Sequence, residues 1–313
     1  MKWSYASQRK EYGRALVELG KSRKDVVVLD ADLSSSTRTA DFAKEFPEHF
    51  FNCGIAEQNM MGVAAGLAAS GKVVFASTFA VFATGRCWDQ IRQSIAYPNL
   101  NVKICATHAG ITVGGDGASH QTGEDVALMR TLPNFTVGVP ADAIETYKMT
   151  KAFAEWRGPC YMRMGRVDFP NVTEWEDPFQ IGKGSILREG EDVTLMGCGI
   201  MVSRCLEAAE LLEKRNVSAK VVNMSAIKPL DEALVEDAVR STGCIVTAEE
   251  HNVLSGLGSA VATFLVEHQP VPLRRVGLMD TFGESGEGEE LMRKYGLTAE
   301  RIVEAAEEVM RRR

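Results

Sequence analysis

Short apolar runs alternate with helix-patterned segments along most of this 313-residue sequence. Tyr12, Ala15, Leu16 and Leu19 have helical spacing, and VVVLDADL at 26–33 is typical of a buried strand. The strand-like runs that follow, each beside a helical pattern, are HFFNCG, KVVFASTF, NVKICATHAG, FTVGVPA and PCYMRMGR. Such alternation constrains the fold strongly, because it predicts a mostly parallel sheet that is covered by helices on both faces.

A change of composition divides the sequence into two parts. VDFPNVTEWEDPFQIGKG, at 167–184, has two prolines, several acidic residues and few periodic apolar positions, which is typical of a linker. A second, smaller series of strand and helix patterns follows it. We therefore expect an α/β protein of two domains, residues 1–168 and 189–313, joined by a linker over residues 169–188. Each domain should contain a mostly parallel sheet flanked by helices.

The composition is that of a soluble globular protein, with 45% hydrophobic and 25% charged residues. A net charge of −7 and a pI near 5.4 argue against a nucleic-acid-binding surface. The N-terminal segment lacks the apolar core of a signal peptide, and the uncharged run after Glu57, residues 58–71, is too short to span a bilayer. Seven cysteines without CxxC spacing predict reduced thiols rather than disulfides or a zinc site. We therefore expect a cytoplasmic protein without a membrane partner.

Polar and aromatic residues gather where the predicted strands of the first part end. In open α/β sheets, ligands bind beyond the carboxyl ends of the strands. The residues found there are Asp32, Ser36, Glu57, Phe79, Phe82, His108, His120, Arg163 and Arg166. The sequence therefore predicts a ligand site at this edge of the sheet.

Glu57 is the one charge in CGIAEQNMMGVAAGLAASG, a small and apolar stretch that predicts a helix over residues 56–70. One interpretation is a carboxylate that is favoured by the helix dipole, typically by about 0.3–1 kcal/mol. The other is a buried acid that meets a ligand, since small residues on one face of the helix permit close approach of another helix. Burying an ionised carboxylate is costly unless it is hydrogen-bonded.

Three motifs occur in an order that is typical of one enzyme family. GIAEQNM with its Gly/Ala-rich helix, then STFAVF, then THAGITVGGDGASHQTGED resemble the thiamine-diphosphate enzymes of the transketolase family. The resemblance implies a pyrimidine-binding domain over residues 1–168 and a transketolase C-terminal domain over residues 189–313. It also implies that Glu57 is catalytic, because the family's glutamate hydrogen-bonds the cofactor's aminopyrimidine and favours the tautomer that activates the cofactor.

The resemblance implies that further residues contact the cofactor. Phe79 and Phe82 would pack against the aminopyrimidine ring, although two phenylalanines are also ordinary core residues. Ile55, two residues before Glu57, is expected to contact the cofactor as well. A third family aromatic falls here at Gly85, which leaves that wall open, or filled by Trp88 or a partner subunit.

Substrate contacts are implied by the same comparison. His120 resembles the catalytic histidine near the reacting carbon, and Asp116 the acid that reads substrate hydroxyl groups. Arg9, Ser36, His108 and Arg166 would form a phosphate clamp. Asp32 also aligns near the substrate. Arg163 is an alternative to Arg166, a structural loop is the alternative for the histidines, and a solvated arginine is the alternative for Arg9.

A missing metal motif leads to the expectation of a partner. GDG at 115–117 is not followed by an asparagine at the family's spacing, since Asn134 is too close and Asn171 too far. We therefore expect no metal ligands here, and Mg²⁺ (or Ca²⁺) held by an N-terminal, diphosphate-binding subunit. The resemblance implies a split transketolase in which thiamine diphosphate is shared between the subunits, with self-association through both domains and an α₂β₂ assembly. AEEHNVLSGLGSAVA is assigned to assembly, with His251 as an interface or core histidine.

The expected reaction is transfer of a two-carbon ketol unit between sugar phosphates, with those of the pentose phosphate pathway as the default. Alternatives are the β-subunit of a 2-oxo-acid dehydrogenase and a deoxyxylulose-phosphate synthase-like enzyme. A non-catalytic assembly or regulatory subunit is an alternative of another class. The sugar-reading pair Asp116 and His120 favours the transketolase.

Overall fold

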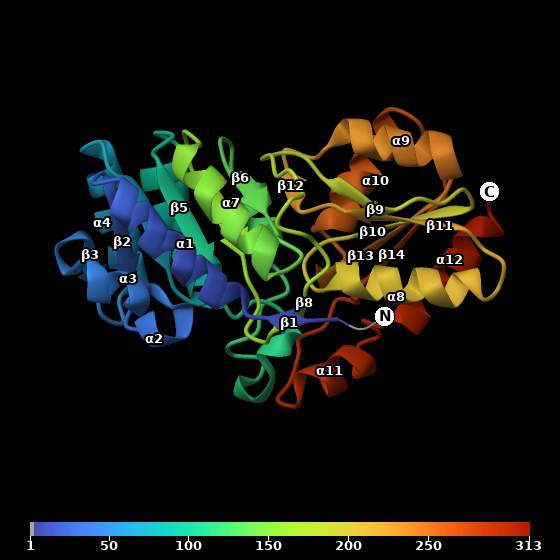
Figure 1. Ribbon diagram of the computed structural model, residues 1–313, viewed down its shortest axis with the longest axis horizontal. Coiled ribbons are helices and arrows are strands. Elements are labelled where there is room, and N and C mark those ends of the chain that lie inside the picture. Colours follow the sequence, from blue (N-terminus) through green and yellow to red (C-terminus); the bar gives the residue numbers. More distant parts are fainter. Residues whose placement is uncertain (1–2) are drawn as a thin grey trace.

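The computed structural model describes residues 3–313, and in this part of the chain a seven-stranded and a five-stranded sheet form two halves (Figure 1). The larger sheet has the strand order β12-β6-β7-β5-β4-β2-β3, and its strands are parallel except for β12. The bounds are β2 Val26–Asp30, β3 Phe50–Asn52, β4 Val73–Ser77, β5 Val102–Ala106, β6 Thr136–Gly138, β7 Cys160–Arg163 and β12 Ala226–Lys228. The predicted α/β class with mostly parallel sheets is confirmed.

Helices cover both faces of this sheet, because alternate residues of its strands are apolar on both sides. Val26 and Val28 of β2 pack with helices on one face, and Val27 and Leu29 with helices on the other. The first face is covered by α1 (Gln8–Ser22), α3 (Thr39–Glu45) and α7 (Ala143–Glu155), and the second by α4 (Glu57–Ala69) and α6 (Asp125–Arg130). Two short helices, α2 (Ser34–Thr37) and α5 (Trp88–Gln90), follow β2 and β4.

The second half repeats this layered arrangement on a smaller scale. Its sheet has the order β14-β13-β10-β11-β9, with β9 antiparallel. The strands are β9 Ser185–Arg188, β10 Val193–Gly197, β11 Ala219–Asn223, β13 Ile245–Asn252 and β14 Leu273–Leu278. Helices α8 (Met201–Glu213) and α12 (Ala299–Met310) cover one face, and α9 (Glu232–Thr242) and α10 (Leu257–Glu267) the other (Figure 1).

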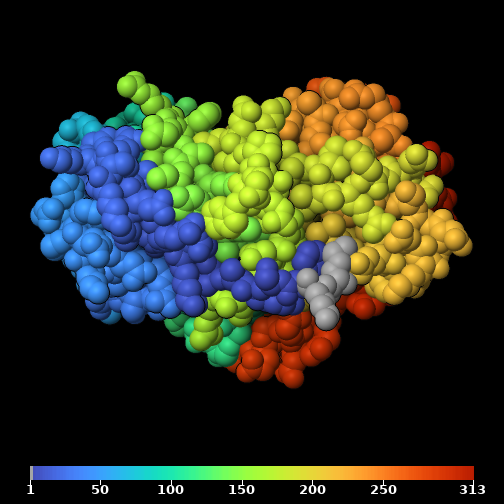
Figure 2. Space-filling model, viewed as in Figure 1, coloured from blue at the N-terminus to red at the C-terminus, as the bar shows by residue number. Residues whose placement is uncertain are grey.

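The segment between the halves is more structured than its composition suggests. Its strand β8 (Phe169–Pro170) pairs with β1 (Tyr5–Ala6), and β9 already belongs to the second sheet. Phe179 and Ile181 pack against the core on the α1–α7 side, and Figure 2 shows this yellow-green segment lying between the two halves. Because β12 of the second half also joins the larger sheet, the domain boundaries at residues 168 and 189 stay a prediction.

The helical segment that follows β4 is irregular. It begins with a π-helical turn, Phe82–Arg86, continues through α5 and ends with a second π-helical segment, Ile91–Ala96. A π-helical turn widens the helix and changes the direction of the side chains that follow it, and such turns are frequent at functional sites. The position of Arg86 depends on this turn.

Three further findings concern the cysteines, membrane-spanning helices and metal-binding groups of the described residues. All seven cysteines carry free thiols, and six of them are buried. Within residues 3–313 we find no helix that is both long and apolar enough to cross a bilayer. The same residues contain no group of three or more His, Cys, Asp or Glu side chains that could hold a metal ion.

Candidate active site

Glu57 is the first residue of α4 and is 3% exposed, although it is charged. Met60, Met61 and Ala64 bury one face of this helix against the sheet, while Gly62 is exposed on the other face. The helix N-terminus favours a carboxylate, but its position there does not by itself require burial. A carboxylate buried in this way needs a hydrogen-bonding partner.

That partner is Arg86, from the π-helical turn after β4. Its Nη1 donates a hydrogen bond of 2.8 Å to Glu57 Oε1, while the guanidinium lies over the ring of Phe82, with Cζ 4.5 Å from the ring centroid. The carbonyl of Arg86 accepts a hydrogen bond of 2.9 Å from Gln58 Nε2, which ties the turn to α4. Sequence reasoning missed Arg86, although it directly follows Gly85, the position where the family pattern is interrupted.

Four aromatic side chains meet beside this pair. The rings of Phe79 and Phe82 are stacked at 5.8 Å between centroids, and Phe79 also stacks on His108 at 3.8 Å. His120 makes edge contacts to Phe82 at 5.4 Å and to Phe79 at 6.4 Å. We call Phe79, Phe82, His108 and His120 the aromatic cluster. The three separate sequence motifs that supplied Glu57, the phenylalanines and the histidines therefore meet at one place.

The electrostatic environment of His108 keeps its imidazole neutral. Its side chain is 4% exposed, its backbone is left-handed at φ 57°, and its Nδ1 lies 2.9 Å from Thr107 Oγ1. Burial, and then the positive charges of Arg9 and Arg166, lower the pKa of His108 to about 3. His120 is less buried, and its Nδ1 lies 3.0 Å from Ser119 Oγ.

Two arginines lie close to these histidines. Arg9 Nη1 and Nη2 donate to the carbonyl oxygens of Ser36, at 2.8 Å, and of Arg166, at 2.7 Å. Arg166 donates to the carbonyl of Val113, and its Nη1 lies 3.7 Å from Asp116 Oδ2. Burial, and then the charges of Arg38 and Arg166, lower the pKa of Arg9. The buried Nε of Arg9 has no hydrogen-bond partner among the described residues.

Two predicted residues lie outside these contacts. Asp32 is exposed at the carboxyl end of β2, where its carboxylate accepts a hydrogen bond of 3.2 Å from Asn52 Nδ2. Ile55 is 80% exposed in the chain by itself. Asp32 lies near the start of α2, and Ile55 lies near the start of α4. Contact of either residue with a ligand stays a prediction.

Arg163, the alternative to Arg166, lies in a buried ionic cluster between the two halves. Its Nε donates to Asp125 Oδ2 at 3.0 Å, and its Nη2 donates to the carbonyl of Glu250 at 2.8 Å. Burial alone would lower its pKa, but the carboxylates of Asp125 and Glu250 together raise the pKa of Arg163 above its usual range. His251 is buried in the same region, with its Nδ1 2.9 Å from the Asn252 carbonyl. The arginine beside Arg9 is therefore Arg166.

Glu250 connects the second half to the glycine-rich loop. Its Oε1 accepts a hydrogen bond of 2.7 Å from the backbone N–H of Thr112, which lies in the helical turn Ile111–Asp116. Gly110 is required next to it, because a Cβ there would come within 2.2 Å of the Glu250 carboxyl group. The segment AEEHN was expected to serve assembly, so this contact was also missed.

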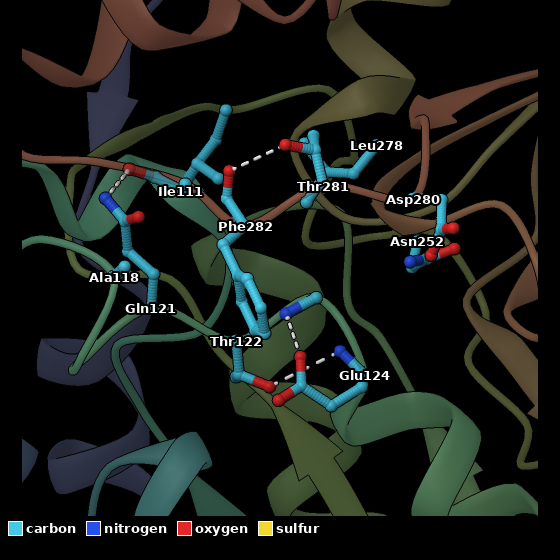
Figure 3. A pocket seen from close by; sticks show the side chains of 12 residues that line it. Ile111, Ala118, Gln121, Thr122, Glu124, Asn252, Leu278, Asp280, Thr281 and Phe282 are labelled. Carbon is cyan, nitrogen blue, oxygen red and sulfur yellow. Dashed lines mark hydrogen bonds between the residues drawn. The ribbon is translucent and has the colours of Figure 1, made fainter.

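Other residues of the second half support the far side of this loop. Helix α11 (Gly288–Lys294) and the segment before it contact the loop, as the neighbouring red and green segments of Figures 1 and 2 show. A cavity of about 340 Å³ lies between them (Figure 3). The ring of Phe282 points toward Thr122 and Glu124 there, and Gln121 Nε2 donates to the Ile111 carbonyl. This cavity is lined by other residues than those of the aromatic cluster.

Of the expectations for the wall at Gly85, an open wall agrees with the structure of the chain by itself, and Trp88 does not fill it. Trp88 donates its indole N–H to the carbonyl of Leu128 at 3.1 Å and packs against the core. Position 85 faces open space, since a Cβ there would meet nothing within 4 Å. The side chain that lies beside Phe82 and Glu57 is instead that of Arg86.

Comparisons with known proteins agree with this arrangement. The transketolase pyrimidine-binding domain matches residues 4–171, and the transketolase C-terminal domain matches residues 182–302. The chain belongs to the transketolase family. A protein described as a transketolase C-terminal section from Methanocaldococcus jannaschii is 50% identical over 98% of both chains. The 6-deoxy-6-sulfo-D-fructose transketolase subunit SqwH of a Clostridium species is 43% identical over 97% of this chain and 95% of its own length.

Solved structures of transketolases show the same fold. A split-gene transketolase, solved as an inactive β4 tetramer, is 55% identical and has a TM-score of 0.92 over 98% of this chain and 99% of its own.

In sequence, human transketolase is 36% identical over 95% of this chain, which spans 48% of the human protein. The chain thus spans about half the length of such single-chain transketolases.

Proposed function

We propose that this chain is the C-terminal subunit of a split transketolase, which transfers a two-carbon ketol unit from a ketose phosphate to an aldose phosphate. The observation that carries the proposal is the Glu57 carboxylate, which is 3% exposed and lies beside the aromatic cluster. A dry carboxylate next to flat aromatic rings fits the aminopyrimidine end of thiamine diphosphate, because both a strong hydrogen bond and ring packing are available there. When bound, thiamine diphosphate supplies the electron sink that allows a ketose C–C bond to break.

The predicted site residues would divide between cofactor and sugar. Glu57 would hydrogen-bond the cofactor ring, and Phe79, Phe82 and Ile55 would pack against it. His120, the more exposed histidine of the aromatic cluster, would move a proton at a substrate hydroxyl. Asp116 and Asp32 would bind sugar hydroxyl groups.

The group of Arg9, Ser36, His108 and Arg166 fits a phosphate. Burial, and then the positive charges of Arg38 and Arg166, lower the pKa of Arg9, and an anion between Arg9 and Arg166 would relieve their repulsion. The buried Nε of Arg9, which lacks a partner among the described residues, is a donor that such an anion could use. A neutral His108 would add a hydrogen bond without adding charge.

We further propose that a separate N-terminal subunit holds the diphosphate and Mg²⁺ (or Ca²⁺), in an α₂β₂ complex of the cytoplasm. The support comes from relatives that are described as a C-terminal section or as subunits. The relatives named for 6-deoxy-6-sulfo-D-fructose and apulose-4-phosphate indicate that pentose phosphates are one of several sugar classes to test.

Reconstitution tests the proposed function. The purified chain with thiamine diphosphate, Mg²⁺, a ketose phosphate and an aldose phosphate should be inactive, and adding the N-terminal subunit should start ketol transfer. In the complex, Glu57→Gln should lower kcat by roughly 10²–10⁴-fold. Glu45→Gln, at an exposed glutamate of α3, is the matched control. Unchanged turnover in Glu57→Gln would favour a non-catalytic subunit, and turnover of pyruvate instead of the ketose would favour the two other cofactor-dependent alternatives.

A further inference from the structure

The guanidinium of Arg86 makes two contacts at once with the residues of the proposed pyrimidine pocket. It donates to Glu57 Oε1 at 2.8 Å and lies 4.5 Å from the Phe82 ring centroid. A hydrogen bond to the buried acid and packing on an aromatic ring are also the two contacts expected of the cofactor's aminopyrimidine. The flat guanidinium of Arg86, a group of the chain itself, thus makes both contacts in the pocket.

We propose that Arg86 is a residue of the pyrimidine pocket that holds the Glu57 carboxylate in the cofactor-free chain and is displaced from it by thiamine diphosphate. This inference rests on the proposed function. It makes Arg86 a determinant of cofactor affinity, since binding must first break the contact between Arg86 and Glu57.

The unequal burial of the two partners decides which one moves. Glu57 is 3% exposed and lies on a helix that is packed against the sheet, so its carboxylate cannot turn into water. The Arg86 side chain is 46% exposed and can reach solvent by rotating its long stem. Leaving Glu57 without a cation or cofactor would be costly, whereas a solvated arginine costs little. The arginine therefore protects the buried charge until a ligand replaces it.

The backbone around Arg86 keeps it next to Glu57. The π-helical turn places Arg86 four residues after Phe82, over whose ring it lies, and the Gln58–Arg86 hydrogen bond fixes the turn to the residue after Glu57. Gly85 leaves the adjoining space open, since a Cβ at that position would meet nothing within 4 Å. The interrupted aromatic pattern at Gly85 and the arginine that follows it are thus parts of one local arrangement.

Cofactor binding and the stability of the isolated chain test this inference together. In the reconstituted complex, Arg86→Ala should bind thiamine diphosphate more tightly, with Kd lowered by roughly fivefold or more in calorimetric titration. In the isolated chain without cofactor, Arg86→Ala should lower the melting temperature by several degrees. Combining it with Glu57→Gln should remove most of that loss, because no buried charge is then left unpaired. Arg92→Ala, at an exposed arginine of the next π-helical segment, is the matched control.

Each outcome decides between displacement and its alternatives. An equal or higher Kd in Arg86→Ala would overturn the displacement, and a higher one would show that Arg86 contacts the bound cofactor. Additive melting-temperature losses in the double variant would overturn the protective role. A complex with native Arg86 that binds no thiamine diphosphate would instead overturn the proposed function, and the stability measurements remain interpretable in that case.

Discussion

At the scale of single residues, the site depends on how neighbours set the charge of each group. His108 and Glu57 are both nearly inaccessible to water, yet one is kept neutral and the other is paired with a cation. Burial and the nearby arginines lower the pKa of His108, because both oppose a second positive charge in the same space. Neither property follows from the identity of the residue.

His108 should therefore stay uncharged across the physiological pH range. With a pKa of about 3 in the folded chain, its ring NMR signals should remain those of neutral imidazole from pH 8 to pH 5. In the urea-unfolded chain the same ring should titrate near its ordinary pKa of about 6.5. Since the folded pKa is the lower one, the stability that a neutral His108 contributes is complete above pH ~6.5 and is lost as the pH falls toward 3. A titration midpoint near 6.5 in the folded chain would contradict this.

At the scale of elements, the loop between β5 and α6 is positioned by contacts from the second half. This loop carries His108, Asp116 and His120, and Glu250 accepts a hydrogen bond from the N–H of Thr112 in its first turn. Glycine at position 110 permits this close approach, and the segment before α11 contacts the loop from the far side. The loop can therefore keep a fixed shape although it has little regular structure of its own.

Removing the Glu250 side chain should displace the loop and leave the cofactor contacts unchanged. We expect Glu250→Ala to raise KM for the sugar phosphate by roughly 10-fold or more, because displacing substrate-binding groups by about 1 Å can be that costly. Glu250→Gln keeps an oxygen that can accept from Thr112 and should retain most of the native KM. Kd for thiamine diphosphate should stay close to the native value in both variants. A KM that is equal in Ala and Gln variants would contradict a positioning role.

At the scale of the whole molecule, the two halves share buried interactions. β12 of the second half adds to the larger sheet, and Arg163 of β7 bonds both Asp125 and the carbonyl of Glu250. Tyr161 also donates to Asp125, at 2.6 Å. Because these groups are removed from water, each depends on the others for its hydrogen bonds.

Breaking this cluster should destabilise the entire chain. Arg163→Met would leave two buried carboxylates without their cation, and we expect the free energy of unfolding to fall by roughly 3–5 kcal/mol in urea titrations. Arg188→Met removes the partner of Glu213, which is 68% exposed, and should cost less than about 1 kcal/mol. Equal losses in the two variants would show that the cluster does not join the halves.

The local sequence was sufficient for the α/β class, for the strands that carry the site and for the motifs that meet there, because apolar periodicity and short motifs depend on neighbouring residues. The linker composition predicted where one half ends, and that boundary stays a prediction, because β9 pairs in the second sheet and β12 in the larger one. Only the tertiary structure shows that Arg86 pairs with Glu57, that Arg163 is buried beside Asp125 and that Glu250 bonds the loop. These contacts join residues far apart in the chain, and what decides them is the burial of charge, which arises when separate elements pack together.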